Sequence, residues 1–136
     1  MNPDLSVVFP VFNEEENIPI LLDEIAAALR GEPWTYEMVA VNDGSRDRSL
    51  EILHQSKTKY PNLRVLTFEK NSGQTAALDA AWRAAHGKYV VSLDADLQND
   101  PADIPKMMRE LERAGADMVI GVRVNRQDTW SRKMQS

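Results

Sequence analysis

Five short apolar runs, separated by stretches with helical spacing, limit this chain to very few folds. The runs are rich in Val, Leu, Phe and Tyr, and they are Leu5–Phe9, Glu37–Val41, Leu63–Phe68, Lys88–Leu93 and Asp117–Gly121. Several are almost continuously apolar, as expected of strands that are covered on both faces. Strands that alternate with helices form a mostly parallel sheet. The pattern therefore predicts an α/β, Rossmann-like domain with helices on both faces of the sheet.

The intervening segments carry helix periodicity and helix boundary signals. Apolar residues recur at i, i+3, i+4 and i+7 from Ile18 to Leu29, from Leu78 to Ala85 and from Ile104 to Leu111. Gly87 is predicted to end the second of these helices. The third has Asp100 as N-cap, followed by Pro101 at the first helical position. A weaker helix is predicted over Ser49–Lys57.

Size and composition limit the number of domains and the classes of function. The chain has 136 residues, which suits one domain, predicted to cover residues 1–136. Its net charge of -5 argues against nucleic-acid binding, which usually shows a basic excess. It has no cysteine, so disulfides and zinc–thiolate sites are excluded. No signal peptide or membrane-spanning run is visible, so the sequence predicts a soluble cytoplasmic chain.

Ligands of open parallel sheets bind beyond the carboxyl ends of the strands, so the loops after the strands are the places to search. The first loop, Pro10–Asn17, can be read as a turn with an N-cap at Asn13 or Asn17. The second, Asn42–Asp47, can be a tight turn with Ser45 as a helix cap, or Asp43 can accept hydrogen bonds from a ribose or a base. In the third, Asn71–Gln74, a glycine provides either backbone freedom or close approach of a ligand.

The loop after the fourth strand gives the strongest signal. Asp94 and Asp96 are two residues apart, and alternate side chains of an extended chain point the same way. Two converging carboxylates repel each other unless a cation or a proton lies between them. Mg²⁺ and Mn²⁺ prefer such oxygen ligands and are commonly held by one or two carboxylates together with substrate phosphates. The sequence therefore favours a divalent metal site over a solvated acidic loop.

The segment after the fifth strand reverses the charge of the chain. Residues 121–133 contain four cationic side chains and one acidic side chain. The segment is either a solvated basic tail or an anion site, because guanidinium groups bind phosphate oxygens in bidentate fashion. An acidic loop and a basic loop at one edge of the sheet indicate a diphosphate held between them.

Taken in order, these loops resemble family 2 glycosyltransferases of the GT-A fold. The matching segments are Phe9–Glu14, Asn42–Ser45 and Asp94–Pro101, and the later Gly121–Lys133 is similar to the branch that uses polyisoprenyl phosphates. That branch includes dolichol-phosphate mannosyltransferases and undecaprenyl-phosphate aminoarabinose transferases. The resemblance covers essentially the whole chain. One small departure is Asn42, where the family often has a second Asp.

The resemblance implies a role for particular residues. Those expected to bind the donor are Pro10, Phe12, Glu14, Asp43, Asp94 and Lys133. Those expected to meet the metal are Asp94, Asp96 and Gln98. The catalytic residues implied are Asp96, Arg123 and Arg132, with the two arginines on phosphates of donor or acceptor.

The implied reaction is inverting transfer of a sugar from a UDP or GDP donor to a polyisoprenyl phosphate, with Mg²⁺ or Mn²⁺ as cofactor. Family members continue through acceptor-side elements, often into transmembrane helices, so this chain is predicted to be the N-terminal, sugar-nucleotide-binding part. A full-length form would work at the inner face of the membrane and associate with it through those later segments. The sequence also allows a homo-oligomer.

Three other readings remain open. A family 2 transferase can act on a polysaccharide or a soluble acceptor, which needs a catalytic base. A non-catalytic fragment can bind the sugar nucleotide without transferring it. A nucleotidyltransferase shares the fold class and the metal, but it usually has a glycine-rich basic loop after the first strand, where this chain is acidic.

Overall fold

The computed structural model describes residues 2–115 with their side chains and the backbone of residues 119–123. The strands are β1 (Leu5–Val11), β2 (Tyr36–Asp43), β3 (Leu63–Phe68), β4 (Tyr89–Ser92) and β5 (Val119–Arg123). The helices are α1 (Ile18–Leu29), α2 (Ser49–Ser56), α3 (Gln74–Ala84) and α4 (Ile104–Arg113), with a short 3₁₀ turn, η1 (Pro101–Asp103), before α4. All four predicted helices and all five predicted strands are therefore present.

The strands form one parallel sheet in the order β3-β2-β1-β4-β5. The chain moves outward from β1 to β3 and then returns to the other side of β1 to form β4. The neighbouring strands β1 and β4 therefore mark the point at which the strand order reverses, where open α/β sheets bind ligands. The predicted α/β class with a parallel sheet is confirmed.

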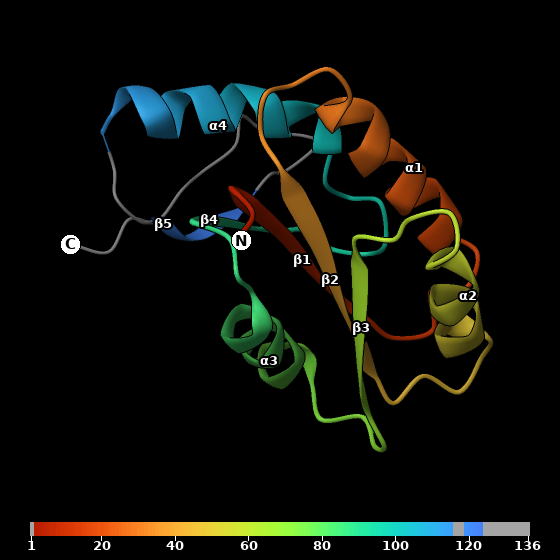
Figure 1. Ribbon diagram of the computed structural model, residues 1–136. Coiled ribbons are helices and arrows are strands. Elements are labelled where there is room, and N and C mark those ends of the chain that lie inside the picture. The colour runs from red at the N-terminus through yellow and green to blue at the C-terminus, as the bar shows by residue number, and fades with distance from the viewer. Residues whose placement is uncertain (1, 116–118, 124–136) are drawn as a thin grey trace.

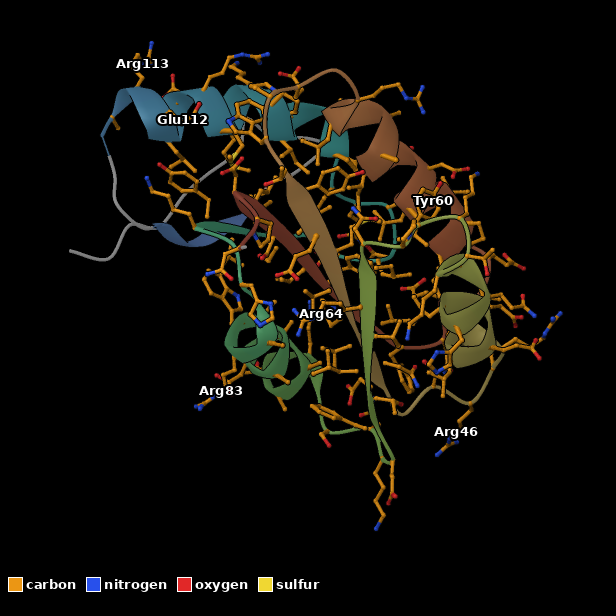
Figure 2. The ribbon with its side chains drawn as sticks, in the orientation of Figure 1. Arg46, Tyr60, Arg64, Arg83, Glu112 and Arg113 are labelled. Carbon is orange, nitrogen blue, oxygen red and sulfur yellow. The ribbon has the colours of Figure 1, made fainter. Side chains whose placement is uncertain are left out.

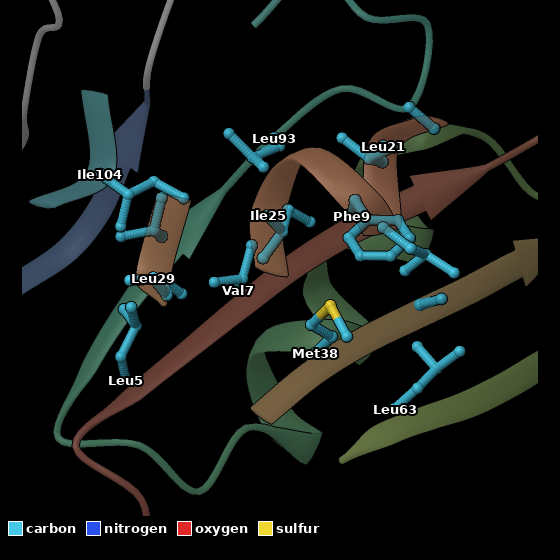
Figure 3. Packing of buried hydrophobic residues seen from close by; sticks show 14 of the residues in the cluster. Leu5, Val7, Phe9, Leu21, Ile25, Leu29, Met38, Leu63, Leu93 and Ile104 are labelled. Atoms are coloured by element: carbon cyan, nitrogen blue, oxygen red, sulfur yellow. The ribbon is translucent and has the colours of Figure 1, made fainter. Parts of the chain in front are cut away.

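Helices cover both faces of the sheet (Figure 1). The side chains of Leu5, Val7 and Phe9 in β1 pack with buried residues of α1, α2 and α4 in one cluster. Figure 3 shows these β1 side chains beside Leu21 and Ile25 of α1. The alternate residues of β1 and β2 pack with the small residues of α3 on the other face. Burial on both faces explains why the strands read as continuous apolar runs.

Two strands extend further toward the loops than the apolar pattern indicated. β1 continues through Pro10 and Val11, and β2 continues through Asn42 and Asp43, because these residues stay in the parallel ladder. The side chains of Asn42 and Asp43 are almost fully buried. Asp43 therefore stands at the end of a strand and is not part of a free turn.

Of the predicted helix boundary residues, Gly87 has another role and Asp100 acts as a cap. Gly87 does not end α3, because the helix stops at Ala84 and Ala85 is extended. Instead, a Cβ atom on Gly87 would lie 2.6 Å from the backbone nitrogen of Ser6, so only glycine fits between α3 and β4. Asp100 caps as predicted: its carboxylate accepts a hydrogen bond from the amide of Ala102, although the turn that it opens is η1.

No helix within residues 2–115 and 119–123 has the length and apolar character that crossing a bilayer requires.

Candidate functional site

A pocket of about 500 Å³ opens at the carboxyl ends of β1, β2 and β4, beside the start of α3. Every predicted site residue whose side chain the structure describes contributes to its wall. The lining residues are Pro10, Val11, Phe12, Glu14, Asp43, Asn71, Gly73, Gln74, Asp94, Ala95, Asp96 and Gln98. The pocket therefore joins four loops that are far apart in the sequence.

The loop after β1 is fixed by hydrogen bonds to the loop after β2. The Asn13 amide donates to Ser45 Oγ over 2.9 Å, and the Arg46 amide donates to Asn13 Oδ1 over 2.8 Å. Asn13 adopts a positive φ of 54°, which asparagine tolerates better than most residues. The neighbouring Phe12 is 43% exposed and presents its ring in the wall of the pocket. These bonds fix the backbone directly after an exposed aromatic ring.

Of the helix caps predicted for this region, Asn17 takes the N-cap position of α1 without a side-chain hydrogen bond, whereas Ser45 is not the N-cap of α2. Ser45 accepts the Asn13 amide, while α2 begins four residues later and its Ser49 amide donates to Asp47. Asp47 also accepts the Glu15 amide, and Asn17 makes no side-chain cap for α1. Burial raises the pKa of Asp47, but hydrogen bonds from Ser49 and Glu15 outweigh it and hold this pKa below its ordinary value. The polar residues of these two loops therefore bind each other's backbone.

Asp43 organises the loop between β3 and α3. Its Oδ1 accepts the Ser72 amide over 2.7 Å, and its Oδ2 accepts the Gly73 amide and the Asn71 side chain, each over 3.1 Å. Gly44, at φ 67°, lies so close that an added Cβ would sit 2.4 Å from the backbone nitrogen of Asn71. Asp43 thus lines the pocket, but most of its hydrogen-bonding capacity already serves protein donors.

The acidic loop brings its carboxylates to the pocket by a different route from the one predicted. β4 ends at Ser92, Ala95 and Asp96 form a turn, and Leu97 has a positive φ of 66°. The chain there is not extended, so strand alternation does not explain the arrangement. Asp94 and Asp96 nevertheless both line the pocket, and Asp96 is held by a hydrogen bond from the Gln98 amide to its Oδ1.

The oxygen atoms of this loop suit a hard divalent cation. Asp94 and Asp96 offer carboxylates, and Gln98 offers an amide oxygen at the same wall. No cluster of three or more His, Cys, Asp or Glu side chains able to hold a metal occurs within residues 2–115. Mg²⁺ is often bound by only one or two carboxylates, with phosphates and water completing the octahedron. The residues present fit a cation that arrives with a phosphate ligand.

The described wall of the pocket is negative. It contains the carboxylates of Glu14, Asp43, Asp94 and Asp96, and none of the lining residues within 2–115 is Lys or Arg. Of the predicted phosphate-binding residues, Arg132 and Lys133 lie outside the described residues. The backbone of Arg123 ends β5, but its side chain is also outside the description.

Sequence reasoning named the β3–α3 loop but assigned none of its residues to the site. Asn71, Gly73 and Gln74 line the pocket, and Gln74 Nε2 donates a 3.0 Å hydrogen bond to Asp94 Oδ1. Gly73 has a positive φ of 98°, which favours glycine, and no protein atom lies within 4 Å of a Cβ placed on it. The only signal in the sequence was the position of the loop after a strand.

Comparison with known proteins gives a consistent family. The family described as glycosyl transferase family 2 matches residues 6–136. The chain is 42% identical over 130 residues to a dodecaprenyl-phosphate galacturonate synthase of Rhizobium johnstonii, an alignment covering 92% of this chain and 37% of the relative. It is 43% identical over 137 residues to an undecaprenyl-phosphate 4-deoxy-4-formamido-L-arabinose transferase of Pectobacterium atrosepticum, covering 98% of this chain and 41% of the relative. The chain thus spans about two fifths of the length of these relatives.

Solved structures share the fold. Residues 1–349 of S. aureus TarS in complex with UDP-GlcNAc superpose with a TM-score of 0.69 at 28% identity, over 86% of this chain and 33% of that TarS chain. The mannosyltransferase PcManGT of Pyrobaculum calidifontis, in complex with GDP-Man and Mn²⁺, gives a TM-score of 0.69 at 26% identity, over 82% of this chain and 33% of that protein. The α/β sheet of this protein is therefore a GT-A fold, and the chain belongs to glycosyltransferase family 2.

Proposed function

We propose that this chain forms the sugar-nucleotide-binding part of a metal-dependent, inverting glycosyltransferase whose acceptor is a polyisoprenyl phosphate. The observation that carries the proposal is the single pocket that joins an exposed aromatic ring to an oxygen-rich acidic loop. A nucleoside diphosphate has a flat base at one end and phosphates at the other. The two ends of the pocket match those two chemistries.

The nucleoside end is formed by the loops after β1 and β2. The backbone after Phe12 is fixed by the hydrogen bonds of Asn13, and the Phe12 ring is exposed, which suits stacking on a base. Glu14 and Asp43 supply acceptors near it, and acceptors suit the N–H and hydroxyl donors of a base and a ribose. Pro10, next to the last residue of β1, forms part of the pocket wall beside these residues.

The phosphate end needs positive charge that the described wall lacks. Two carboxylates facing a diphosphate would repel it, so a divalent cation between them is the simplest way to bind both. Mg²⁺ or Mn²⁺ held by Asp94, Asp96 and Gln98 would neutralise charge on the departing nucleoside diphosphate. Arg123, Arg132 and Lys133 are proposed as further phosphate partners.

The acceptor follows from the chemistry of transfer and from the relatives. Attack on the anomeric carbon from the face opposite the leaving group gives inversion. A phosphate monoester is already largely ionised at pH 7, so it attacks without a catalytic base. Both relatives are named for polyprenyl phosphates. A lipid acceptor places the whole protein at a membrane surface, proposed to be the inner face.

The test is calorimetric titration of the chain with UDP and GDP, each with Mn²⁺ and with chelator. We expect metal-dependent binding of one nucleotide, and we expect Asp96→Asn to abolish the metal dependence. Asp79→Asn, an exposed change on α3 outside the pocket, is the matched control. A folded chain that binds neither nucleotide contradicts the proposed binding function. Binding that neither chelator nor Asp96→Asn changes contradicts the metal site.

A further inference from the structure

Gln74 links the β3–α3 loop to the acidic loop across the pocket. It is the first residue of α3, and its Nε2 donates to Asp94 Oδ1 over 3.0 Å. α3 packs against β1 and β2, whereas Asp94 follows β4. Both residues line the same cavity. The hydrogen bond therefore spans the wall of the proposed nucleotide site between two separate elements.

Both ends of this hydrogen bond are anchored through the backbone. On one side, the amides of Ser72 and Gly73 donate to the buried carboxylate of Asp43, which fixes the chain directly before Gln74. On the other side, the Asp94 amide donates to the side chain of Asn99, and the Leu93 amide donates to the Val8 carbonyl. Because the backbones are held, the bond orders only the two side chains. Such a contact can fix the direction of the Asp94 carboxylate.

The chemical nature of Gln74 suits a residue that orients a metal ligand. A metal-binding carboxylate commonly has one oxygen on the cation and the other fixed by a hydrogen-bond donor behind it. An amide donor does this without adding positive charge, so the site keeps the full negative charge that attracts a cation. A Lys or Arg in this place would also hold the carboxylate, but it would compete electrostatically with the metal.

We propose that Gln74 is a positioning residue, whose side-chain amide orients Asp94 for a divalent cation. Through Gln74, the cation site is linked to residues 71–73, which are hydrogen-bonded to Asp43. The proposal deepens the function proposed above and rests on it. Gln74 is not a metal ligand in this proposal. Its effect on the cation passes through Asp94.

The test compares Mn²⁺ binding by the wild-type chain and by Gln74→Met, which keeps an unbranched side chain of similar length but removes the donor. Mn²⁺ is titrated calorimetrically, or by the electron paramagnetic resonance signal of free Mn²⁺, in the presence of saturating UDP or GDP. We expect about a 10-fold weaker Mn²⁺ affinity, as is usual when the partner of a metal ligand is lost. Gln55→Met, on the exposed side of α2, is the matched control and leaves the affinity unchanged.

A second measurement separates positioning from direct contact. Nucleotide affinity in chelator is expected to be the same for wild type and Gln74→Met. An equal loss with and without metal would show that Gln74 contacts the nucleotide itself, which overturns the proposal. Unchanged Mn²⁺ affinity in the variant also overturns it, while the proposed function stands. If wild type binds neither nucleotide nor Mn²⁺, the proposed function fails and this inference fails with it.

Discussion

Glu37 provides the sharpest test of how the sheet is held together at the end away from the pocket. It lies near the start of β2, is only 7% exposed and accepts three hydrogen bonds. The donors are the Ser6 hydroxyl at 2.6 Å, the His86 amide at 2.7 Å and Arg64 Nη1 at 2.9 Å. Figure 2 shows Arg64 reaching from β3 toward α3, whose last carbonyl, on Ala84, also accepts from this guanidinium. One carboxylate thus ties the starts of three strands to the end of α3.

The perturbation is Glu37→Gln, which keeps the size of the side chain and removes its charge. The new amide nitrogen is a donor and must face at least one existing donor, so a buried hydrogen bond is lost. A buried polar group left without its partner costs about 1–3 kcal/mol, and hydrogen bonds to charged groups contribute about 1.5–3 kcal/mol each. The Arg64 side chain is 37% exposed, so water can replace its lost hydrogen bond. The decrease in the free energy of unfolding should therefore lie toward the lower end of these ranges. We expect Glu37→Gln to lower the free energy of unfolding by about 2–3 kcal/mol.

The assay is denaturant unfolding followed by circular dichroism, supported by thermal unfolding. For a domain of this size, 1 kcal/mol corresponds to about 3 °C, so the melting temperature should fall by about 6–9 °C. Glu51→Gln is the matched control, because Glu51 is exposed and forms an ion pair with Arg48 at the start of α2, on the surface. Glu51→Gln should lower the free energy of unfolding by less than about 0.5 kcal/mol. A similar loss for both variants, or none for Glu37→Gln, would refute the reasoning.

The same network predicts a pH dependence with a definite sign. Burial by itself raises the pKa of Glu37, but hydrogen bonds from Ser6, His86 and Arg64 outweigh it and place this pKa below the ordinary value of 4.5. A lowered folded-state pKa gives stability that is fully present above the unfolded pKa and is lost as pH falls through the folded pKa. The difference between wild type and Glu37→Gln should therefore be constant at neutral pH and shrink below about pH 4.5. A difference that is unchanged at pH 3 would contradict this assignment.

Two further predictions concern the pocket. Gly44→Ala, at φ 67° and with its Cβ 2.4 Å from the Asn71 nitrogen, should cost about 2–3 kcal/mol in chemical denaturation and weaken nucleotide binding, because two loops must separate. Gly31→Ala, at φ 79° in open space, should cost about 1 kcal/mol and leave binding unchanged; equal binding by both variants would contradict the loop contact. Asp43 already accepts three hydrogen bonds, so it has more room for the single N–H of uracil than for the paired N–H donors of guanine. UDP should therefore bind about 10-fold more tightly than GDP in competitive titration, and tighter GDP binding would refute this argument.

The fold could be predicted from the sequence because strands that are buried on both faces appear as nearly continuous apolar runs. The apolar run at Leu63–Phe68 and the helix at Ile18–Leu29 have the bounds that the structure gives. The ends of β1 and β2 could not be predicted, since Pro10 and Asp43 are poor strand formers that the neighbouring strands hold in the ladder. The prediction that Gly87 ends a helix was wrong, because a glycine is needed there for close contact with Ser6, a residue far away in the sequence.

The membership of the site was predicted better than its internal contacts. The acidic loop could be found because it follows a strand and holds two carboxylates two residues apart. The residues of the loop after β1 were expected at the site only through the family resemblance. The bonds between loops could not be read, because they join residues about 30 positions apart: Asn13 with Ser45, and Asp43 with Ser72. The β3–α3 loop carries a glycine and common polar residues, and nothing in one sequence distinguishes such a loop from a simple turn.

Asp43 illustrates why a motif match and a ligand contact are different statements. By resemblance it is a donor-binding residue, and the pocket wall includes it. The residue is nevertheless only 3% exposed, and its carboxylate accepts hydrogen bonds from the backbone of Ser72 and Gly73 and from the Asn71 side chain. Loss of nucleotide binding on its mutation would therefore follow from collapse of that loop as readily as from loss of a contact. Since Gln74 follows this loop directly and reaches Asp94, one buried carboxylate supports both ends of the pocket. The chain builds the site by fixing backbones first, and the side chains that meet a ligand are set by that scaffold.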